Sequence, residues 1–269
     1  MNTDYKPRFT SKELSAQITE RIQELAEATD TARVSEAMIE YLDMCARFHR
    51  YSPNNLWLIL MAKPEATMIA GYHKWRGMGR YVMRGEKGIA ILAPVIVKDK
   101  DDIEEHNKKL VGFKVVYVFD VSQTDGESMP HPPDWKSPEQ NALLAEKLIR
   151  LAEKKDIKVN VKELAGNTQG ISAGGSIEIA PEAGTKTLIH EIAHELMHRG
   201  EDRPKDHRVR ELEAEAVAFV VGTHFGLEGI SSPNYVALHG AGSEMIMQHI
   251  GRIRSSAAEI ITKLENVHE

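Results

Sequence analysis

Two histidines that lie four residues apart give this chain its clearest chemical signal. They belong to the segment His190-Glu191-Ile192-Ala193-His194. On a helix, residues four apart share one face, so both imidazoles can reach a single ion through bonds of about 2 Å. Glu191 is offset around the helix, where it can act as a general base without binding the ion. The segment therefore predicts a zinc-dependent hydrolase, with Zn²⁺ as cofactor, His190 and His194 as ligands and Glu191 as the catalytic residue.

The residues around the two histidines strengthen this interpretation. The same helical segment carries Leu188, Ile189 and Met197. Because an unpartnered polar group is costly to bury, polar side chains on an apolar helix favour a metal site over two surface histidines. His198 extends the stripe. Its simpler interpretation is a helix-end histidine stabilised by the helix dipole, and contact with a ligand or the substrate is the alternative.

A catalytic zinc site needs a third protein ligand, and a second helical segment offers three glutamates for that role. Glu211, Glu213 and Glu215 are spaced by two residues. Residues two apart on a helix point about 200° away from each other, so neighbouring members of the series cannot all face the ion. Glu213 shares its face with small and apolar residues, whereas Glu211 lies on a more polar stripe. We predict Glu213 as the third ligand and Glu215 as the alternative, with the remaining glutamates orienting an imidazole or lying at the surface.

The elements that must position these groups follow from the spacing of apolar residues and from glycine and proline. We expect helices over residues 11–50, in one or two pieces, and over 56–61, about 143–151, 185–199, 209–225 and 243–264. We expect strands over residues 67–70, 80–83, 89–97, 113–121, 157–161 and 176–180.

The predicted class is α+β with two domains. Residues 1–130 combine helices with a small antiparallel sheet, and residues 131–269 form a mainly helical metallopeptidase-like domain with a small sheet. The boundary lies in the proline- and glycine-rich stretch 123–136, which has the composition of a linker. A glycine-rich hairpin at 170–179 precedes the histidine helix. It is either an ordinary turn or an edge strand beside the metal, to which an extended peptide can be added.

Composition narrows the class of protein further. The formal net charge is −6, which argues against a protein that coats nucleic acid with its whole surface. The single cysteine, Cys45, cannot form an internal disulfide and is expected in the core, which fits a reducing compartment. No apolar run reaches the roughly 18 residues of a membrane span, and the N-terminus lacks the pattern of a secretory signal. We therefore predict a cytoplasmic protein that does not bind a membrane.

One stretch departs from the acidic average. Residues 72–88 carry five cations against Glu86 alone. Aromatic faces for stacking bases, next to cations for phosphates, are what sequence-independent binding of single strands requires. A solvated basic face with core aromatics is the competing interpretation. The candidate DNA contacts are Lys74, Trp75, Arg76, Arg80, Tyr81, Arg84 and Lys87.

Six segments of the N-terminal half resemble the N-terminal domain of ArdC-type antirestriction proteins. The resemblance implies a domain that binds single-stranded DNA, joined to a zinc-metallopeptidase-like domain. The segments that carry it are Tyr51-Ser52-Pro53-Asn54-Asn55, Pro64–Thr67, Gly71–Trp75, Gly79–Val82, Arg84–Ile89 and Val118–Thr124.

The C-terminal half is similar to the ImmA/IrrE metallopeptidases. Their Glu-x-Glu-Ala signature aligns with Glu211-Leu212-Glu213-Ala214, and this alignment again favours Glu213 as a ligand. Glu215 stands where those peptidases usually carry Asn or Asp, which leaves the choice between Glu213 and Glu215 open.

Two functions compete on these grounds. The first is an antirestriction protein that binds single-stranded DNA and hydrolyses a peptide bond of a DNA-associated protein, with Glu191 as the general base. The second is a binding protein without enzymatic activity that protects DNA and keeps zinc as a structural clamp. A structural zinc is normally closed by four protein ligands, and the two histidines plus one glutamate of this chain favour an open site.

Overall fold

The computed structural model describes residues 7–28, 31–98, 108–129, 138–201, 203–230, 233 and 243–266. The chain divides into two compact units, each of which is described separately. Unit 1 consists of Met1–Gln23 and Ser52–Pro130, and unit 2 consists of Glu24–Tyr51 and His131–Glu269. The predicted first domain, residues 1–130, is therefore not continuous, because residues 24–51 pack with the C-terminal half.

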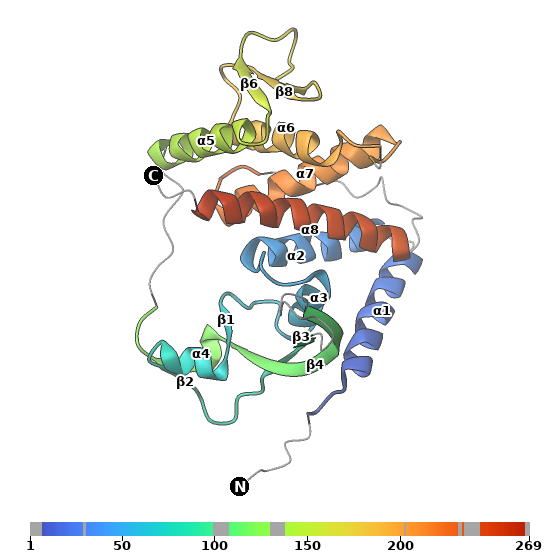
Figure 1. Cartoon of the computed structure of the whole chain (residues 1–269), viewed down its shortest axis with the longest axis vertical. Coiled ribbons are helices and arrows are strands. Elements are labelled where there is room, and N and C mark those ends of the chain that lie inside the picture. The colour runs from blue at the N-terminus through green and yellow to red at the C-terminus, as the bar shows by residue number, and fades with distance from the viewer. Residues whose placement is uncertain are drawn as a thin grey trace. The chain divides into compact units, whose positions relative to one another are not determined.

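Unit 1 is built around a three-stranded antiparallel sheet in the order β1-β4-β3 (Figure 1). A second, two-stranded sheet pairs β2 with β5, and helix α3 packs against β3. Helix α1 begins in this unit and ends just beyond its boundary. The bounds are α1 Ser11–Glu27, α3 Pro53–Ala62, β1 Ile69–Gly71, α4 Tyr72–Gly77, β2 Arg80–Val82, β3 Ile89–Lys98, β4 Lys108–Asp120, η1 Val121–Gln123 and β5 Thr124–Gly126.

Buried polar side chains that bond to the backbone hold unit 1 together. Helix α3 begins at Pro53, after Ser52 caps its first turn. Asn55 in that turn donates to the Leu92 carbonyl and accepts from the Leu92 N–H, both at 2.9 Å, which ties α3 to β3. At the end of β4, the Asp120 carboxylate accepts from the backbone of Thr67 and Met68. Each of these polar groups is satisfied inside the fold, so it stabilises the unit.

Unit 2 packs its helices around α7, which contacts α2, α6 and α8. Val217 and Val220 of α7 are fully buried, as expected for a central helix. A small sheet in the order β6-β8-β7 lies against α6, with β6 parallel and β7 antiparallel to β8. The bounds are α2 Thr31–Arg47, α5 Pro138–Glu153, β6 Lys158–Val161, β7 Gly170–Ser172, β8 Ser176–Ile179, α6 Thr185–Met197, α7 His207–His224 and α8 Ser243–Asn266.

The α+β class with small sheets is confirmed, and the differences from expectation are local. The stretch after Ala66 was expected to be β-type, but α4 forms a short helix there between Gly71 and Gly77. Strand β5 lies inside the expected linker, and residues 130–136 of that linker fall outside the described residues. Cys45 is buried as expected. Among the described residues, no helix is long and apolar enough to cross a membrane.

Candidate metal centre

Helix α6 turns an apolar face inward and a polar face toward a cleft. Ile189, Ile192 and Ala193 are fully buried in unit 2. The imidazoles of His190 and His194 leave the helix on another face, where their side chains are 18% and 14% exposed. This amphipathic pattern places both rings at the edge of the core, where a bound ion can still be reached by a substrate.

The two histidines and one glutamate of α7 form a converging set of metal-ligand atoms. The Nε2 atoms of His190 and His194 lie 3.0 Å apart. The Glu211 carboxylate approaches them at 3.4 Å and 3.3 Å, respectively. In a tetrahedral zinc site with bonds of about 2.0–2.1 Å, ligand atoms are separated by about 3.3 Å. The donor set and its spacing therefore fit a divalent ion held by two imidazoles and a carboxylate, with one position left open.

Glu213, the predicted third ligand, does not face this set. Its side chain is fully buried, and its carboxylate is bonded to His198, His249 and Arg252. On α7, Glu211 points to the cleft and Glu213 points to the core, as the 200° offset between residues two apart requires. The buried face was the wrong criterion, because a site with an open position must border solvent. Glu211 therefore replaces Glu213 as the candidate third ligand.

Glu215, the alternative ligand, contacts the outer nitrogen of one histidine. Its Oε2 lies 3.4 Å from His190 Nδ1, while its Oε1 accepts from Lys186 Nζ at 2.5 Å. A carboxylate on the far nitrogen of a metal-binding histidine fixes the ring orientation and makes the ring a better ligand. Glu215 thus orients His190 and does not join the converging atoms.

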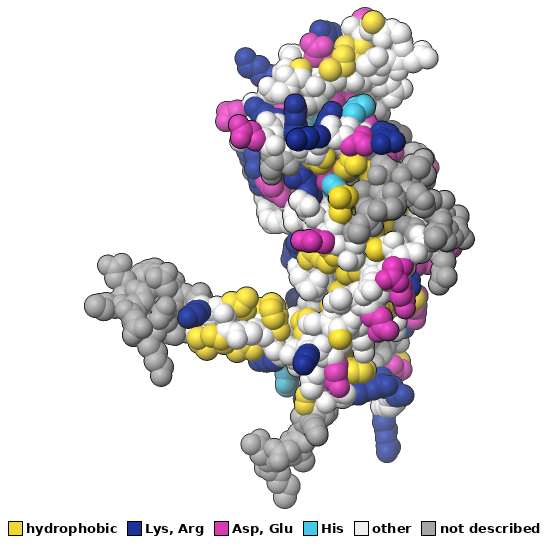
Figure 2. Space-filling view, turned by 90° about the vertical axis from the view of Figure 1, so that its right-hand side faces the viewer, with side chains coloured by type: hydrophobic (Ala, Val, Ile, Leu, Met, Phe, Trp, Pro, Cys, Tyr) yellow, Lys and Arg dark blue, Asp and Glu magenta, His cyan; other side chains and the backbone are white. Residues whose placement is uncertain are grey.

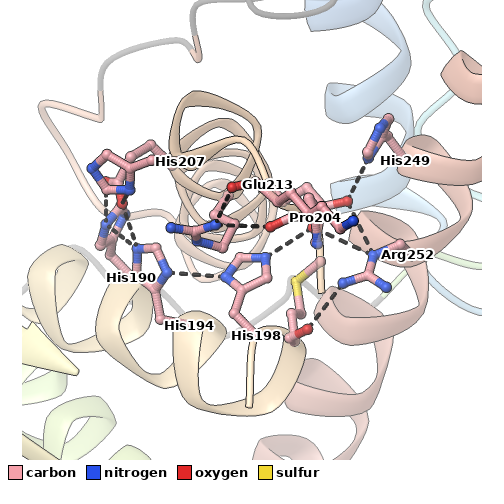
Figure 3. A network of polar contacts seen from close by, with 12 residues as sticks. His190, His194, His198, Pro204, His207, Glu213, His249 and Arg252 are labelled. Carbon is pink, nitrogen blue, oxygen red and sulfur yellow. Dashed lines mark hydrogen bonds and ion pairs between the residues drawn. The ribbon is translucent and has the colours of Figure 1, made fainter. Parts of the chain in front are cut away.

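A relay of hydrogen bonds orients the second histidine in a similar way (Figure 3). His194 Nδ1 lies 3.0 Å from His198 Nδ1, and His198 Nε2 donates to Glu213 at 2.8 Å. Because Glu213 accepts the His198 Nε2 proton, His198 Nδ1 is left to accept from His194 Nδ1–H. The Nε2 lone pair of His194 is then directed into the converging set. Glu213 and His198, each considered in the sequence for another role, act together here.

Arg252 and His249 of α8 keep Glu213 charged inside the core. Arg252 Nε donates to Glu213 Oε1 at 3.1 Å, and His249 Nδ1 lies 2.6 Å from the same oxygen. Burial alone raises the pKa of Glu213, but bonds from His198 and His249 and the nearby Arg252 charge outweigh burial and hold that pKa well below its usual range. Sequence spacing could not find these partners, since α8 is separated from α7 by many residues.

The metal-ligand atoms carry the electrostatics of a cation site. Burial alone lowers the pKa of His190, but hydrogen bonds to Glu211 and Glu215 outweigh it and raise that pKa to about 9. Hydrogen bonds to His190 and His194 hold the pKa of Glu211 well below its usual range. The carboxylates therefore stay ionised at neutral pH and favour a positive charge between them.

Glu191 lies beside the converging atoms but is not one of them. Burial raises the pKa of its carboxyl, and the neighbouring imidazoles oppose that shift. The carboxylate accepts a hydrogen bond from the Ser172 backbone N–H. A Cβ at Gly170 would lie 2.7 Å from the same carboxylate, so glycine is needed there for close approach. Strand β7 and helix α6 together hold Glu191 at the cleft.

The glycine-rich hairpin between β7 and β8 is anchored to α6 by a second glutamate. Glu195 is almost completely buried and accepts from Ser172 Oγ and from the N–H groups of Gly174 and Gly175, at 2.7–2.8 Å. Gly174 and Gly175 have φ values of 70° and 112°, which other residues rarely adopt. The hairpin is thus fixed beside the histidines, and β7 is an edge strand of its sheet.

These groups line one cleft of about 640 Å³. Its wall includes the two histidines, Glu191 and Glu211, the edge strand β7, and a set of basic side chains that the sequence did not point to. Those basic residues are Arg199, Arg203, His207 and Arg210. In this cleft the Glu191 carboxylate lies next to a candidate cation site, an arrangement that is compatible with metal-assisted hydrolysis.

The predicted DNA contacts divide into two groups. Trp75 is fully buried, and its indole N–H donates to the Phe119 carbonyl at 2.9 Å, so its ring cannot stack on a base. The Arg80 guanidinium donates to Thr124 Oγ1 at 2.8 Å and to the Thr124 carbonyl at 2.9 Å. Both residues were predicted DNA contacts. In the structure, Trp75 ties α4 to β4 and Arg80 ties β2 to β5.

The other predicted contacts remain at the surface. Lys74, Arg76, Arg84 and Lys87 are exposed. Tyr81 is 55% exposed, and its hydroxyl donates to Asp125 at 3.0 Å, which leaves the ring face open. Tyr72 is also exposed, at 44%, although the prediction omitted it.

Unit 1 carries a further exposed surface on its longest hairpin. Strands β3 and β4 carry apolar side chains that are about half exposed, and Figure 2 shows hydrophobic side chains gathered along a projecting arm. A strand with one covered face hides every second side chain, but here neighbouring residues such as Ile96 and Val97 are both exposed. The exposed apolar residues are Ile96, Val97, Leu110, Val111 and Phe113.

The chain resembles several known proteins. It is 25% identical to a protein of Bacillus anthracis whose name describes it as uncharacterized, over 96% of this chain and 54% of that protein, so the chain spans about half of that relative's length. Two crystal structures of the antirestriction protein ArdC from plasmid R388 are also similar. The metal-free structure has a TM-score of 0.47 and 17% identity over 81% of this chain and 87% of that one. The Mn(II)-bound structure has a TM-score of 0.46 and 18% identity over 85% of this chain and 99% of that one.

One comparison covers a defined part of the sequence. The family model of the N-terminal domain of anti-restriction factor ArdC matches residues 10–119. That range begins near the start of α1, spans α2 and most of unit 1, and ends one residue before Asp120. The resemblance to ArdC-type antirestriction proteins is therefore confirmed through this part of the chain: residues 10–119 belong to the ArdC N-terminal domain family.

Proposed function

We propose that the chain is a divalent-metal-dependent peptidase whose ion is held by His190, His194 and Glu211. One observation carries the proposal: the Nε2 atoms of both histidines and the Glu211 carboxylate converge within 3.0–3.4 Å on the wall of a cleft. Imidazole and carboxylate ligands suit zinc, and we expect Zn²⁺ as the ion. When bound, such an ion polarises a carbonyl and lowers the pKa of water, which is the chemistry that amide hydrolysis needs.

The side chains around the ion site have separable tasks in this proposal. Glu191 takes the proton from the attacking water and returns it to the leaving amine, and its burial raises its pKa in the direction that a general acid–base needs. Glu215 and the His198–Glu213 relay hold the two imidazoles in orientation. Orientation matters because a misplaced catalytic group costs rate even when every group is present.

Strand β7 suggests how the substrate lies. It is an edge strand beside Glu191, and Ile171 at its centre is 42% exposed. An extended peptide can add to such an edge through main-chain hydrogen bonds. We therefore infer that the substrate is an unstructured or locally unfolded protein segment, and a DNA-associated protein would be brought to the cleft if unit 1 binds DNA.

The decisive experiment compares two glutamate-to-glutamine variants of the full chain. Denatured casein and a mixed peptide library serve as probes, with Zn²⁺ present or removed by a chelator. We expect Glu191→Gln to keep stoichiometric metal and lose about 10²–10⁴-fold in cleavage rate. Glu182→Gln, at an exposed glutamate ahead of α6, is the matched control and should cleave normally. Cleavage that survives both the chelator and Glu191→Gln would overturn the proposal.

A second proposal concerns unit 1, which we propose binds single-stranded DNA. The exposed cations Lys74, Arg76, Arg84 and Lys87 lie on α4 and around β2, with Tyr72 and Tyr81 exposed on the same elements. If about four phosphates are neutralised, affinity should fall with salt at a log–log slope of about −3. A titration of the full chain with a 30-nucleotide strand at about 50–200 mM salt tests this. Absence of salt-sensitive binding would leave the basic residues as a solvated surface.

Together, the two experiments distinguish a peptidase from the competing function, a DNA-binding protein without enzymatic activity. If the full chain binds single-stranded DNA but Zn²⁺ never supports cleavage, the binding protein that protects DNA is the better description. The experiment must use the full chain, because a fragment ending near residue 130 contains α2 without α7, against which α2 packs.

A further inference from the structure

Three helices of unit 2 end at one place, away from the candidate metal centre. Helix α7 ends at His224, and helix α8 ends at Asn266, one residue after Glu265. His49 lies two residues beyond the end of α2 at Arg47. Along α7, His224 is thirteen residues from Glu211, which corresponds to about 20 Å. The cluster His49–His224–Glu265 is therefore too distant to share an ion with the first site.

The three side chains present metal-ligand atoms to one another. His224 Nε2 lies 3.3 Å from Glu265 Oε1, and His49 Nε2 lies 3.6 Å from Glu265 Oε2. All three ligand atoms lie within 4.8 Å of one another. The two histidine–carboxylate distances are close to the separation of about 3.3 Å between ligands of a tetrahedral ion. The two imidazoles therefore face the two oxygens of one carboxylate, and a bound ion would draw the three ligand atoms together.

The tautomer of His224 follows from its other nitrogen. His224 Nδ1 lies 2.7 Å from the Ala46 carbonyl, which can only accept, so Nδ1 carries the proton. In the neutral ring, Nε2 then turns a lone pair toward the Glu265 carboxylate. Two acceptors that face each other at 3.3 Å require a positive species between them. A histidine that donates Nδ1–H to a backbone carbonyl is also the usual arrangement of a metal ligand.

His49 provides a second, independent observation. Its side chain is only 8% exposed, and its Nδ1 has no hydrogen-bond partner among the described residues. Its Nε2 faces Glu265 and is approached by Arg50 Nε at 3.4 Å, which is at the limit of a hydrogen bond. His49 is thus deeply buried with an unpaired Nδ1, while its Nε2 faces the carboxylate and accepts only a long hydrogen bond from Arg50.

Groups of both signs of charge surround this place. The carbonyl ends of α2, α7 and α8 converge there, and each helix C-terminus carries a partial negative charge. Two arginines are already bound there: Arg254 donates to the His49 carbonyl at 3.0 Å, and Arg50 bonds Glu265 Oε2 at 3.0 Å. The Arg50 side chain is 71% exposed, so it can leave the carboxylate when another cation arrives.

We propose that His49, His224 and Glu265 form a second metal site, which binds Zn²⁺ or a similar transition-metal ion and clamps the ends of α2, α7 and α8. Water or other solvent-derived ligands would complete the coordination. Among the described residues that form the site, none corresponds to Glu191. The ion would fasten residues 24–51 to the C-terminal part of unit 2, and its three protein ligands would leave a fourth position to water, unlike the four protein ligands of a closed structural zinc. A plain ion pair between a protonated His224 and Glu265 is the competing description.

Metal stoichiometry of the full chain tests the site separately from the first one. The first site is removed by the double change His190→Ala and His194→Ala. In that background we expect one Co²⁺ per chain, with the visible absorption of a four-coordinate ion, and Zn²⁺ should displace it. Adding Glu265→Gln, at a side chain that is 31% exposed, should lower Co²⁺ affinity at least about tenfold. His73→Ala, at an exposed histidine, is the matched control and should change nothing.

A variant that replaces no ligand keeps the test decisive if a ligand variant folds poorly. Arg50→Ala removes the cation that competes for Glu265, so Co²⁺ should bind several-fold more tightly. Saturating metal should also raise the melting temperature by about 5–10 °C, as expected for a ligand present at about 100 times its Kd. If the double variant binds no Co²⁺, or if Arg50→Ala and Glu265→Gln both leave its affinity unchanged, the cluster is an ion pair and the proposal is wrong. None of these results depends on whether the first site is catalytic.

Discussion

Two sets of polar residues, one in each unit, serve different purposes. In unit 1, Asn55 and Asp120 direct their side chains at backbone groups. In unit 2, His190, His194 and Glu211 direct theirs at one another and at a cleft. The difference shows how a polar residue that stabilises the fold can be told from one that belongs to a binding site. A buried polar group whose partners are main-chain atoms stabilises a fold, whereas side chains whose ligand atoms converge on one another form a candidate cation site.

The largest effect is expected from replacing two glutamates of α7 that have different roles. Glu211→Ala should remove stoichiometric metal from the first site, lowering affinity by more than the roughly 10–100-fold expected for a residue that only orients a ligand. Glu213→Gln should retain the ion with affinity reduced within that range. Elemental analysis after dialysis against Zn²⁺ buffer measures both. Full metal retention in Glu211→Ala would return Glu213 or Glu215 to the ligand position.

Removing the Glu213 carboxylate should cost stability. Its loss leaves Arg252 and two histidines facing a gap in the core, and breaking a buried ion pair typically costs about 3–5 kcal/mol. We expect Glu213→Ala to lower the free energy of unfolding by that amount in urea denaturation. Glu211→Ala is the control, because its side chain is 44% exposed and its loss should cost far less in metal-free protein. Equal costs for the two would contradict the division into ligand and scaffold.

In unit 1, two neighbouring asparagines offer a matched pair. Asn55 is buried and satisfies both backbone groups of Leu92, whereas Asn54 is exposed. Asn55→Ala leaves a buried N–H and a buried carbonyl unpaired, which should cost about 2–4 kcal/mol. Asn54→Ala should change stability by less than about 0.5 kcal/mol. Thermal denaturation of the two variants measures this, and similar melting temperatures would show that Asn55 is not part of the scaffold.

Asp120 should make the stability of unit 1 depend on pH. Burial alone raises its pKa, but hydrogen bonds from Ser122, Thr67 and Met68 outweigh burial and lower it. A carboxyl whose pKa is lower in the folded state stabilises the fold above its unfolded pKa of about 3.9, and this contribution is lost as pH falls through the folded pKa. Asp120→Asn should therefore be less stable than wild type at pH 7 but show a flatter loss of stability below about pH 4. Parallel acid-unfolding curves would rule this out.

The smallest expected effect distinguishes a surface cation from a structural one. Lys87→Ala should flatten the salt dependence of DNA binding by about 0.7 units in the log–log slope. Arg80→Ala should instead lower the melting temperature, because its guanidinium bonds the β5 backbone. Fluorescence anisotropy at several salt concentrations, together with thermal denaturation, measures both. A changed slope in Arg80→Ala without a change in stability would place Arg80 among the DNA contacts after all.

Local periodicity was enough for much of this structure. The spacing of His190 and His194 predicted a helix with both rings on one face, and α6 has that arrangement. Helical geometry also showed that Glu211 and Glu213 must point apart, but it could not tell which of the two faces borders the cleft. The face that borders the cleft depends on which helices cover α7. This packing cannot be predicted from the residues of α7 alone.

Long-range packing accounts for the remaining differences. The association of α2 with α7 joins residues more than 160 positions apart, so the sequence suggested a continuous first domain. Trp75 was assigned to DNA because it lies among cations, but its indole N–H meets the Phe119 carbonyl across 44 residues. The cluster His49–His224–Glu265 escaped notice for the same reason: its three members have no shared motif and meet only where three helices end.

The division of unit 2 into two separate pieces of sequence sets an order for its synthesis. Residues 24–51 leave the ribosome before unit 1 is complete, whereas α7, against which α2 packs, emerges only after unit 1. Until then the buried face of α2, with Met38, Leu42 and Cys45, has no native cover. Unit 1 can complete its own sheets first, and a chain cut short after residue 200 contains the two histidines but neither Glu211 nor the helix that carries it. A product that ends there would therefore lack one of the three residues of the candidate cation site.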